Sequence, residues 1–272
     1  MTFNVAVVGA TGNVGREILN ILIEREFPVD QITALASSVS RGKEISYGDD
    51  VIKVQELEGF DFSKTDIALF SAGSEVSAKY APEAAKYAVV IDNTSFFRMF
   101  DDVPLTVPEV NIDSVAGYKK RKIISNPNCA AIQIAVAINP LQKLSKIKRL
   151  VVTTMQSVSG AGKDAMDELY DQTKGSYMNA EMRMKSFTKR IAFNLIPQIG
   201  DIGNDGYCEE EQKISEELKK IVSKDIESSI TTVRVPLFIG HSISVNVEME
   251  KEHNLKDIYK ILDNAPGVYL VD

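Results

Sequence analysis

The sequence lacks tryptophan and has only two cysteines and two histidines among its 272 residues. The histidines, His241 and His253, stand apart and no CxxC pairing occurs, so a structural zinc site is not expected. The cysteines, Cys129 and Cys208, lie in unrelated contexts, and reduced thiols are the better expectation for a cytosolic chain of this size. We therefore expect neither a metal centre nor a disulfide.

Long apolar runs and an excess of positive charge are also absent. No segment is apolar over the roughly 20 residues that a membrane helix needs, and no charged and then apolar leader opens the sequence. We therefore expect a cytoplasmic protein without a membrane partner. The formal net charge is -7 and the basic residues are spread out, which disfavours a nucleic-acid partner but allows small anionic ligands.

The first part of the sequence alternates short apolar strands with helical patterns. A strand at 3–8, a glycine-rich turn with a helix to 27, and a strand at 32–37 form one unit. Further strand patterns follow at 66–70, 88–93 and 122–125, with a helix between the first two. The alternation predicts a doubly wound, mostly parallel Rossmann-like α/β sheet in a dinucleotide-binding domain at residues 1–128.

The second part changes character at about residue 148. Longer alternating strands are predicted near 148–158, 231–238 and 242–250, and helices near 162–172 and 209–222. Few helices separate the last strands, so we expect an α+β domain with a mixed or antiparallel sheet at residues 129–272.

The segment SNPNC, residues 125–129, places a cysteine at the start of an apolar helical pattern. Pro127 cannot lie inside a helix and Asn128 is a good N-cap, so Cys129 falls in the first turn. The unpaired amides there stabilise an anion and favour the thiolate. The local pattern alone also fits a cysteine that only packs.

The turn GATGNVG follows the first strand and has the spacing GxxGxxG. Glycine lets the backbone approach a pyrophosphate, and the N-terminus of the next helix accepts the anion. A tight turn without a ligand is the alternative. The candidate cofactor residues in this turn are Gly9, Thr11, Gly12, Asn13 and Val14.

The second strand ends in ASSVSRGK and carries no Asp or Glu for ribose hydroxyls. Hydroxyls of Ser37 and Ser38 and the guanidinium of Arg41 suit a 2'-phosphate, which favours NADP over NAD. Other candidate cofactor residues lie at strand ends or in small-residue turns where ligands of open sheets bind. They are Ser71, Gly73, Asn93, Ser159 and Gly160.

Two further stretches carry candidate catalytic groups. Gln156 lies where a strand stops, and Arg234 and His241 flank a bend that contains Gly240. Strict strand alternation would put Arg234 and His241 on opposite faces, whereas the bend could bring both into one pocket.

Taken together, the whole chain resembles the aspartate-β-semialdehyde dehydrogenase family. The resemblance rests on GATGNVG, ASSVSRGK, SNPNC, QSVSGAG, FNLIPQIG with EEEQK, and RVPLFIGHS, in the family's order. The related N-acetyl-glutamyl-phosphate reductases typically carry glycine before the nucleophile, so Asn128 favours the semialdehyde enzyme.

The resemblance implies NADPH-dependent conversion of β-aspartyl phosphate to aspartate semialdehyde and phosphate, on the route to lysine, diaminopimelate, methionine, threonine and isoleucine. It implies a homodimer or homotetramer. It gives Cys129 the role of nucleophile, His241 that of acid/base group, and Gln156 an orienting role. The implied substrate ligands are Asn128, Arg234 and Glu210, with Arg98 and Lys213 for phosphate. Spacing favours Glu210, although Glu209 and Glu211 are adjacent.

The chain departs from the family at its end, APGVYLVD, where members usually continue with further strands and a helix. We expect a C-terminally incomplete chain whose last residues form a strand without neighbours. A reductase of another acyl phosphate and a truncated, non-catalytic homologue are the alternative interpretations.

Overall fold

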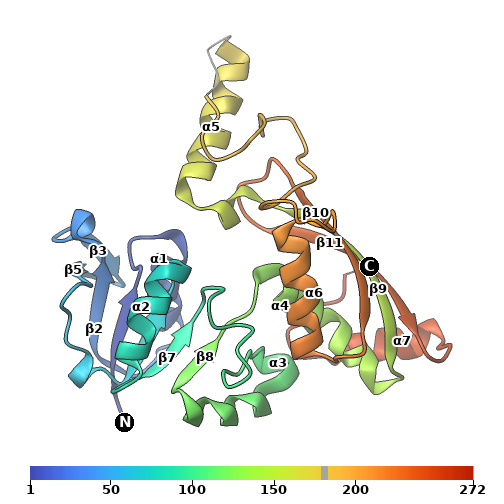
Figure 1. Cartoon of the computed structure of the whole chain (residues 1–272), viewed down its shortest axis with the longest axis horizontal. Helices are drawn as coiled ribbons and strands as arrows, with labels where there is room; N and C mark the ends of the chain where they lie inside the picture. Colours follow the sequence, from blue (N-terminus) through green and yellow to red (C-terminus); the bar gives the residue numbers. More distant parts are fainter. Residues whose placement is uncertain (179–182, 272) are drawn as a thin grey trace. The chain divides into compact units, whose positions relative to one another are not determined.

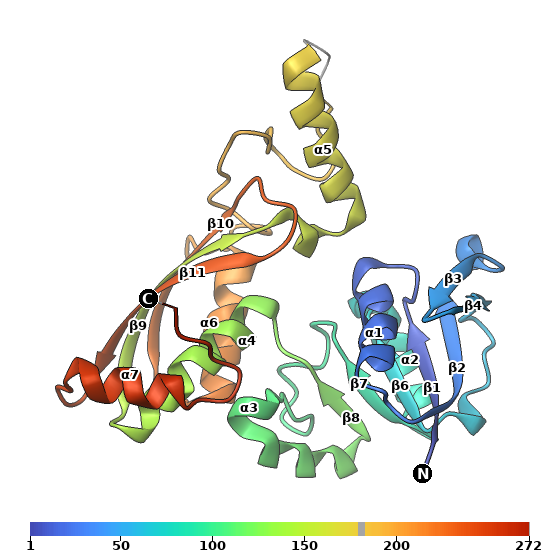
Figure 2. The same cartoon turned by 180° about the vertical axis from the view of Figure 1, so that it is seen from behind.

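The computed structural model describes residues 1–178 and 183–271 (Figures 1 and 2). These residues form two compact units. The first comprises Met1–Thr106 and Ile112–Pro127, and the second comprises Val107–Asn111 and the chain from Asn128 onward. Within the described ranges, no helix is long and apolar enough to cross a membrane.

The first unit contains a parallel sheet with the strand order β5-β2-β1-β6-β7-β8. The strands are β1 (Phe3–Val8), β2 (Val29–Ala36), β5 (Gln55–Glu56), β6 (Ile67–Phe70), β7 (Val89–Asp92) and β8 (Ile123–Ser125). The chain runs outward from β1 in both directions, to β2 on one side and to β6 on the other. The predicted doubly wound parallel sheet is confirmed.

Helices cover both faces of this sheet, which explains why its strands read as continuous apolar runs. Val5 and Val7 pack with Leu19 of α1 (Asn13–Glu24) in one core cluster. Val8 packs in a second cluster that includes Ala81 of α2 (Ser74–Ala84). Alternate residues of β1 therefore belong to opposite cores.

Gly15 allows α1 to pack closely on the turn before it. A Cβ at this position would lie 2.2 Å from the carbonyl oxygen of Gly9 and 2.7 Å from Cα of Ala10. We expect Gly15→Ala to lower the free energy of unfolding by about 3 kcal/mol, because backbone atoms cannot rotate away as side chains do. Urea unfolding tests this, with Gly117→Ala as the control because nothing lies within 4 Å of its added Cβ. Equal urea midpoints for Gly15→Ala and Gly117→Ala would contradict the inference that Gly15 is needed for close packing.

The first unit also contains elements that the sequence reasoning missed. A hairpin, β3 (Glu44–Tyr47) and β4 (Asp50–Lys53), follows β2 and leads into β5. All three strands have four residues or fewer, too short for a clear alternation pattern. Beyond β7, the chain continues through a 3₁₀ segment, Ile112–Lys120, to β8.

The second unit is built on a mixed sheet with the order β10-β9-β11. β9 (Ile147–Gln156) pairs in parallel with β10 (Glu227–Arg234) and antiparallel with β11 (His241–Met249). One face buries Leu150, Val152 and Thr154, while Val151 and Thr153 on the other face are exposed. α4 (Cys129–Ile138) and α6 (Glu209–Ile221) pack on the buried face (Figure 1). The prediction of a mixed sheet is confirmed.

The remaining helices of this unit are α3 (Pro108–Asn111), α5 (Lys163–Met178) and α7 (Leu255–Asp263). The sequence reasoning missed α7, although Asn254 caps it by accepting a hydrogen bond from the amide of Asp257. The strand expected at the end of the sequence is wrong, because Leu270 and Val271 lie in no strand. Asp272 lies outside the described residues.

Candidate active site

Cys129 is the first residue of α4, as the sequence predicts for the helix start. The side-chain oxygen of Asn128 accepts hydrogen bonds from the amides of Ala130 at 2.8 Å and Ala131 at 3.4 Å. The backbone amide of Asn128 in turn donates to the buried carboxylate of Glu217 at 2.6 Å. The N-terminal turn that carries the thiol is therefore fixed by capping from within and from α6.

The thiol of Cys129 is exposed and faces an imidazole. Its Sγ lies 3.3 Å from Nε2 of His241, the first residue of β11. Gly240, with a φ of 88°, makes the bend that leads into β11. A thiol and an imidazole at this distance form the usual arrangement of an activated cysteine nucleophile.

Gln156, Arg234 and His241 lie in one row across the sheet. Gln156 ends β9, where it pairs with Arg234 at the end of β10 and with His241 at the start of β11. Residues directly opposite each other in neighbouring strands project from the same face. The bend at Gly240 thus brings together the two groups that simple alternation would separate.

The three adjacent glutamates at the start of α6 have different partners. Oε1 of Glu210 accepts from the side-chain amides of both Gln156 and Asn128, each at 2.9 Å. Glu209 pairs with Lys213 at 3.2 Å, and Glu211 accepts from the amides of Cys208 and Thr232. Of the three, Glu210 is therefore the one whose hydrogen bonds join it to the cluster around Cys129.

Arg234 supplies a positive charge in this cluster. Its guanidinium is buried, and Nη1 donates to the carbonyl oxygen of Ser157 at 2.6 Å. Burial lowers the pKa of Arg234 from its ordinary value, while the charges of Glu210 and Cys129 act in the opposite direction. Since arginine starts from a very high pKa, the guanidinium stays charged beside a carboxylate. The cluster therefore offers Arg234 to bind an anionic group and Glu210 to bind a cationic one.

Both candidate phosphate ligands have other partners in the structure. Lys213 pairs with Glu209, half-exposed on α6. Arg98 lies in the first unit and donates to the carbonyl oxygens of Asn126 at 3.0 Å and Asn93 at 2.9 Å.

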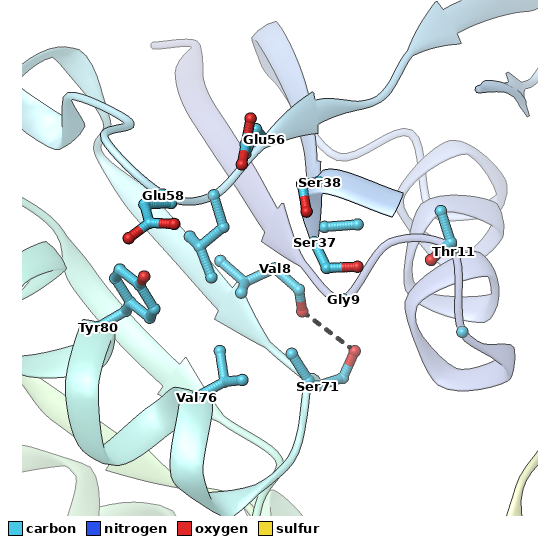
Figure 3. A pocket seen from close by; sticks show the side chains of 14 residues that line it. Val8, Gly9, Thr11, Ser37, Ser38, Glu56, Glu58, Ser71, Val76 and Tyr80 are labelled. Carbon is cyan, nitrogen blue, oxygen red and sulfur yellow. Dashed lines mark hydrogen bonds between the residues drawn. The ribbon is translucent and has the colours of Figure 1, made fainter. Parts of the chain in front are cut away.

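The candidate cofactor site is an open cavity of about 510 Å³ in the first unit. It lies at the carboxyl ends of β1, β2 and β6, where the strand order reverses and open α/β sheets bind ligands (Figure 3). Gly9 has a φ of 88°, and a Cβ there would lie 2.9 Å from the backbone of Ser71. Six predicted residues line the cavity: Gly9, Thr11, Gly12, Ser37, Ser38 and Ser71.

The other predicted cofactor residues do not line this cavity. Asn13 and Val14 begin α1, Gly73 caps α2, and Asn93 accepts a hydrogen bond from Asn126. Ser159 and Gly160 belong to the second unit, in the 3₁₀ turn Val158–Ala161. Arg41 approaches the cavity through its ion pair with Glu56 at 3.4 Å.

Sequence reasoning missed part of this cavity, including two carboxylates. β5 pairs with the end of β2, with Glu56 opposite Ala36, and this places Glu56 and Glu58 on the cavity wall (Figure 3). A ribose-binding carboxylate is expected at the end of β2, whereas these two come from β5 and the residues that follow it. The other lining residues that were not predicted are Val8, Ala36, Leu57, Ala72, Val76 and Tyr80.

The residues present suit a dinucleotide. The turn before α1 permits close approach, and the N-cap of α1 is Gly12, which has no side chain to occupy the N-terminus of the helix. Serine hydroxyls stand at the ends of β2 and β6. A pyrophosphate and a ribose fit these groups.

Comparisons with known proteins agree with both units. The NAD-binding domain of semialdehyde dehydrogenases matches residues 4–118, and their dimerisation domain matches residues 138–272. The aspartate-semialdehyde dehydrogenase of Rickettsia bellii is 53% identical over 270 residues, which cover 99% of this chain and 80% of that protein.

Solved structures give the same answer. The crystal structure of aspartate semialdehyde dehydrogenase II from Vibrio cholerae matches with a TM-score of 0.98 and 46% identity, covering 100% of this chain and 82% of that one. A structure of the same enzyme complexed with ASA also has a TM-score of 0.98 and 46% identity, covering 100% of this chain and 81% of that one. The chain belongs to the aspartate-semialdehyde dehydrogenase family of oxidoreductases.

Proposed function

We propose that the chain converts β-aspartyl phosphate to aspartate semialdehyde and phosphate with NADPH, through a thioester on Cys129. The reaction serves the biosynthesis of lysine, diaminopimelate, methionine, threonine and isoleucine in the cytoplasm. The observation that carries the proposal is the distance of 3.3 Å between Sγ of Cys129 and Nε2 of His241, beside the opposite charges of Arg234 and Glu210. The complex of the Vibrio cholerae enzyme with ASA supports it.

The charges of the cluster suit an amino-acid substrate. Arg234 pairs with the substrate's α-carboxylate, and Glu210 accepts hydrogen bonds from its α-ammonium group. Gln156 and Asn128 both donate hydrogen bonds to Glu210 and hold the carboxylate of Glu210 in place. Arg98 and Lys213 remain the proposed phosphate ligands. To bind phosphate, Lys213 leaves its ion pair with Glu209.

The nucleophile's chemistry follows from its position. The thiolate of Cys129 attacks the acyl carbon, the carbon–oxygen bond to phosphate breaks, and phosphate leaves with the electron pair. When bound, the dinucleotide supplies the hydride that reduces the resulting thioester. His241 donates to the oxygen that becomes negative, and when the sulfur–carbon bond breaks, the aldehyde is released and the thiolate is restored.

NADP is the proposed cofactor because the loop after β2 presents serine hydroxyls and a guanidinium. Ser37 and Ser38 line the cavity, and Arg41 is held nearby by Glu56. We expect Arg41→Ala to raise KM for NADPH about tenfold, the scale of one charge-assisted hydrogen bond, with little effect on NADH. Steady-state kinetics with both cofactors test this, with Arg25→Ala as a control cation that does not line the cavity. An equal loss with both cofactors would argue against contact with the 2'-phosphate.

We also propose that the chain assembles as a homodimer, or as a homotetramer built from dimers. The match of residues 138–272 to a dimerisation domain supports this, and one face of the β9 sheet is uncovered in the single chain. Light scattering coupled to size exclusion measures the mass directly, and a monomer at micromolar concentration would contradict assembly.

The activity is tested in the oxidative direction. The purified chain should reduce NADP when given aspartate semialdehyde and phosphate together, and should fail when either is omitted. N-acetyl-glutamate semialdehyde should be used at least about 10³-fold less well, because a neutral N-acyl group cannot pair with Glu210 as an ammonium does. The opposite substrate preference would favour the alternative reductase, and NADPH binding without turnover of either aldehyde would indicate a non-catalytic homologue.

A further inference from the structure

Glu217 is a buried acidic residue that the reaction proposed above does not use. It lies on α6 with 2% of its surface exposed, and its Oε2 accepts a hydrogen bond from the backbone N–H of Asn128 at 2.6 Å. Asn128 directly precedes Cys129 in the chain. We propose that Glu217 is a positioning residue, which holds the first turn of α4 where Cys129 faces His241.

Each polar atom of Asn128 takes part in a hydrogen bond. Its carbonyl oxygen accepts from the amide of Ile132 at 2.9 Å, and its side-chain oxygen caps the amides that follow it in the same helix. These bonds stay within α4 and shape its first turn. The two nitrogen atoms donate to α6 instead, the side-chain amide to Glu210 at 2.9 Å and the backbone N–H to Glu217. The bonds to Glu210 and Glu217 therefore connect this turn to α6.

α6 gives these two acidic side chains a common support. Glu210 and Glu217 are about two helical turns apart and so lie on the same face of α6. The helix is anchored by Ile214, Leu218 and Ile221, which are buried. Two acceptors on one anchored element bind two donors of one residue. This arrangement restrains the orientation of that residue as well as its distance from α6.

The bond to Glu217 differs from the bond to Glu210 in what it holds. The side-chain amide of Asn128 can rotate about its own torsions, whereas the backbone N–H moves only with the chain. A buried N–H needs an acceptor, because it has no water to replace one. If the acceptor on Glu217 is withdrawn, we therefore expect the chain at Asn128 to shift and Cys129 to shift with it.

The consequence for turnover rests on the proposed function. Sγ of Cys129 lies 3.3 Å from Nε2 of His241, and the two residues belong to different elements, α4 and β11. Activation of the thiol and its attack on the acyl carbon both depend on this geometry, and a displacement on the order of 1 Å can cost about 10²-fold in rate. Glu217 acts on this geometry through Asn128 and has no part in the substrate contacts proposed above.

Two substitutions separate the position of the acceptor from its charge. Glu217→Gln keeps an oxygen on a side chain of the same length and carries no charge. Glu217→Asp keeps a carboxyl group and withdraws its oxygens by about 1.5 Å, one carbon–carbon bond. We expect kcat for phosphate-dependent oxidation of aspartate semialdehyde to fall about tenfold in Glu217→Asp and to stay within a few-fold of the wild type in Glu217→Gln. KM for the semialdehyde should change little in both, because Arg234 and Glu210 are retained.

The reactivity of Cys129 reports the same displacement without any turnover. Alkylation by iodoacetamide at neutral pH should be about tenfold slower in Glu217→Asp, because the thiol no longer faces the imidazole as closely. The rate should be retained in Glu217→Gln. Hydrogen exchange at the amide of Asn128, measured by NMR, should be faster in Glu217→Asp than in the wild type.

Glu168→Asp is the matched control for a purely structural role. Glu168, on α5, is also buried and accepts hydrogen bonds from backbone amides, those of Lys185 at 2.9 Å and Ser186 at 2.5 Å. We expect this variant to lose stability in urea but to keep kcat and the alkylation rate of Cys129. Equal losses of kcat in Glu168→Asp and Glu217→Asp would reduce Glu217 to support of the fold and overturn the inference.

The order of the Glu217 variants is decisive. Normal kcat and alkylation in Glu217→Asp would overturn the inference, and so would an impaired Glu217→Gln beside an active Glu217→Asp, since charge would then matter more than position. If Glu217→Asp does not fold, an impaired but folded Glu217→Gln still contradicts the proposal, and an active one supports it.

The wild-type protein separates this inference from the proposed function. A wild type that does not oxidise aspartate semialdehyde would sink the proposed function, while alkylation and hydrogen exchange would still test Glu217. Turnover by the wild type, together with equal alkylation rates in the wild type and Glu217→Asp, would overturn the role of Glu217 alone.

Discussion

Replacing Cys129 by alanine should abolish phosphate-dependent reduction of NADP by aspartate semialdehyde, with a loss of at least about 10⁴ in kcat. Without the sulfur no thioester forms, and alanine at the start of α4 places no nucleophile beside Nε2 of His241. Stopped-flow and steady-state absorbance of NADPH measure the loss.

Two controls make this result specific. Cys208→Ser replaces the other cysteine, which is buried with its Sγ 3.2 Å from the hydroxyl of Thr232, and should keep kcat within a few-fold. NADPH should bind the Cys129→Ala protein as tightly as the wild type, because the cavity lies wholly in the first unit. Near-normal turnover in Cys129→Ala would refute the thioester mechanism.

The second large effect is expected from Arg234→Leu. Loss of the guanidinium leaves Glu210 without its neighbouring positive charge and removes the group that pairs with the substrate carboxylate. We expect kcat/KM for aspartate semialdehyde to fall about 10³-fold, in the range for truncating one partner of a buried charge pair. Most of the change should appear in KM, because the contact exists before chemistry begins.

Matched variants separate charge from folding. Arg234→Lys keeps the charge but not the bidentate geometry and should recover only part of the loss. Arg149→Leu removes an exposed arginine from β9 of the same sheet and should have little effect. A value of KM for Arg234→Leu equal to that of the wild type would show that another group binds the carboxylate.

Local features of the site were predictable because local chemistry determines them. Pro127 and Asn128 predict the start of α4 and so place Cys129, and the spacing of glycines after β1 predicts the turn at the cavity. These inferences need only a few neighbouring residues. The doubly wound sheet was predictable for a related reason, since each strand and helix carries its own periodicity.

Features that depend on register between distant strands were not predictable. Glu56 reaches the cavity because a strand of two residues pairs beside β2, and two residues carry no periodic pattern. The carboxylate of Glu217 accepts a hydrogen bond from the backbone amide of Asn128, although the two residues are 89 positions apart in the sequence. The row formed by Gln156, Arg234 and His241 likewise appears only when the strands are paired.

The row of Gln156, Arg234 and His241 limits which changes of length this domain can accept over evolution. The face on which each of these side chains lies depends on the register of its strand with the neighbouring strand. One residue inserted or deleted within a strand would therefore turn that side chain to the opposite face. Substitutions along β9, β10 and β11 leave the register of the strands unchanged, whereas a single insertion or deletion within them shifts it. Drift in length should therefore accumulate outside these strands, and recombination between homologues should succeed where breakpoints avoid them.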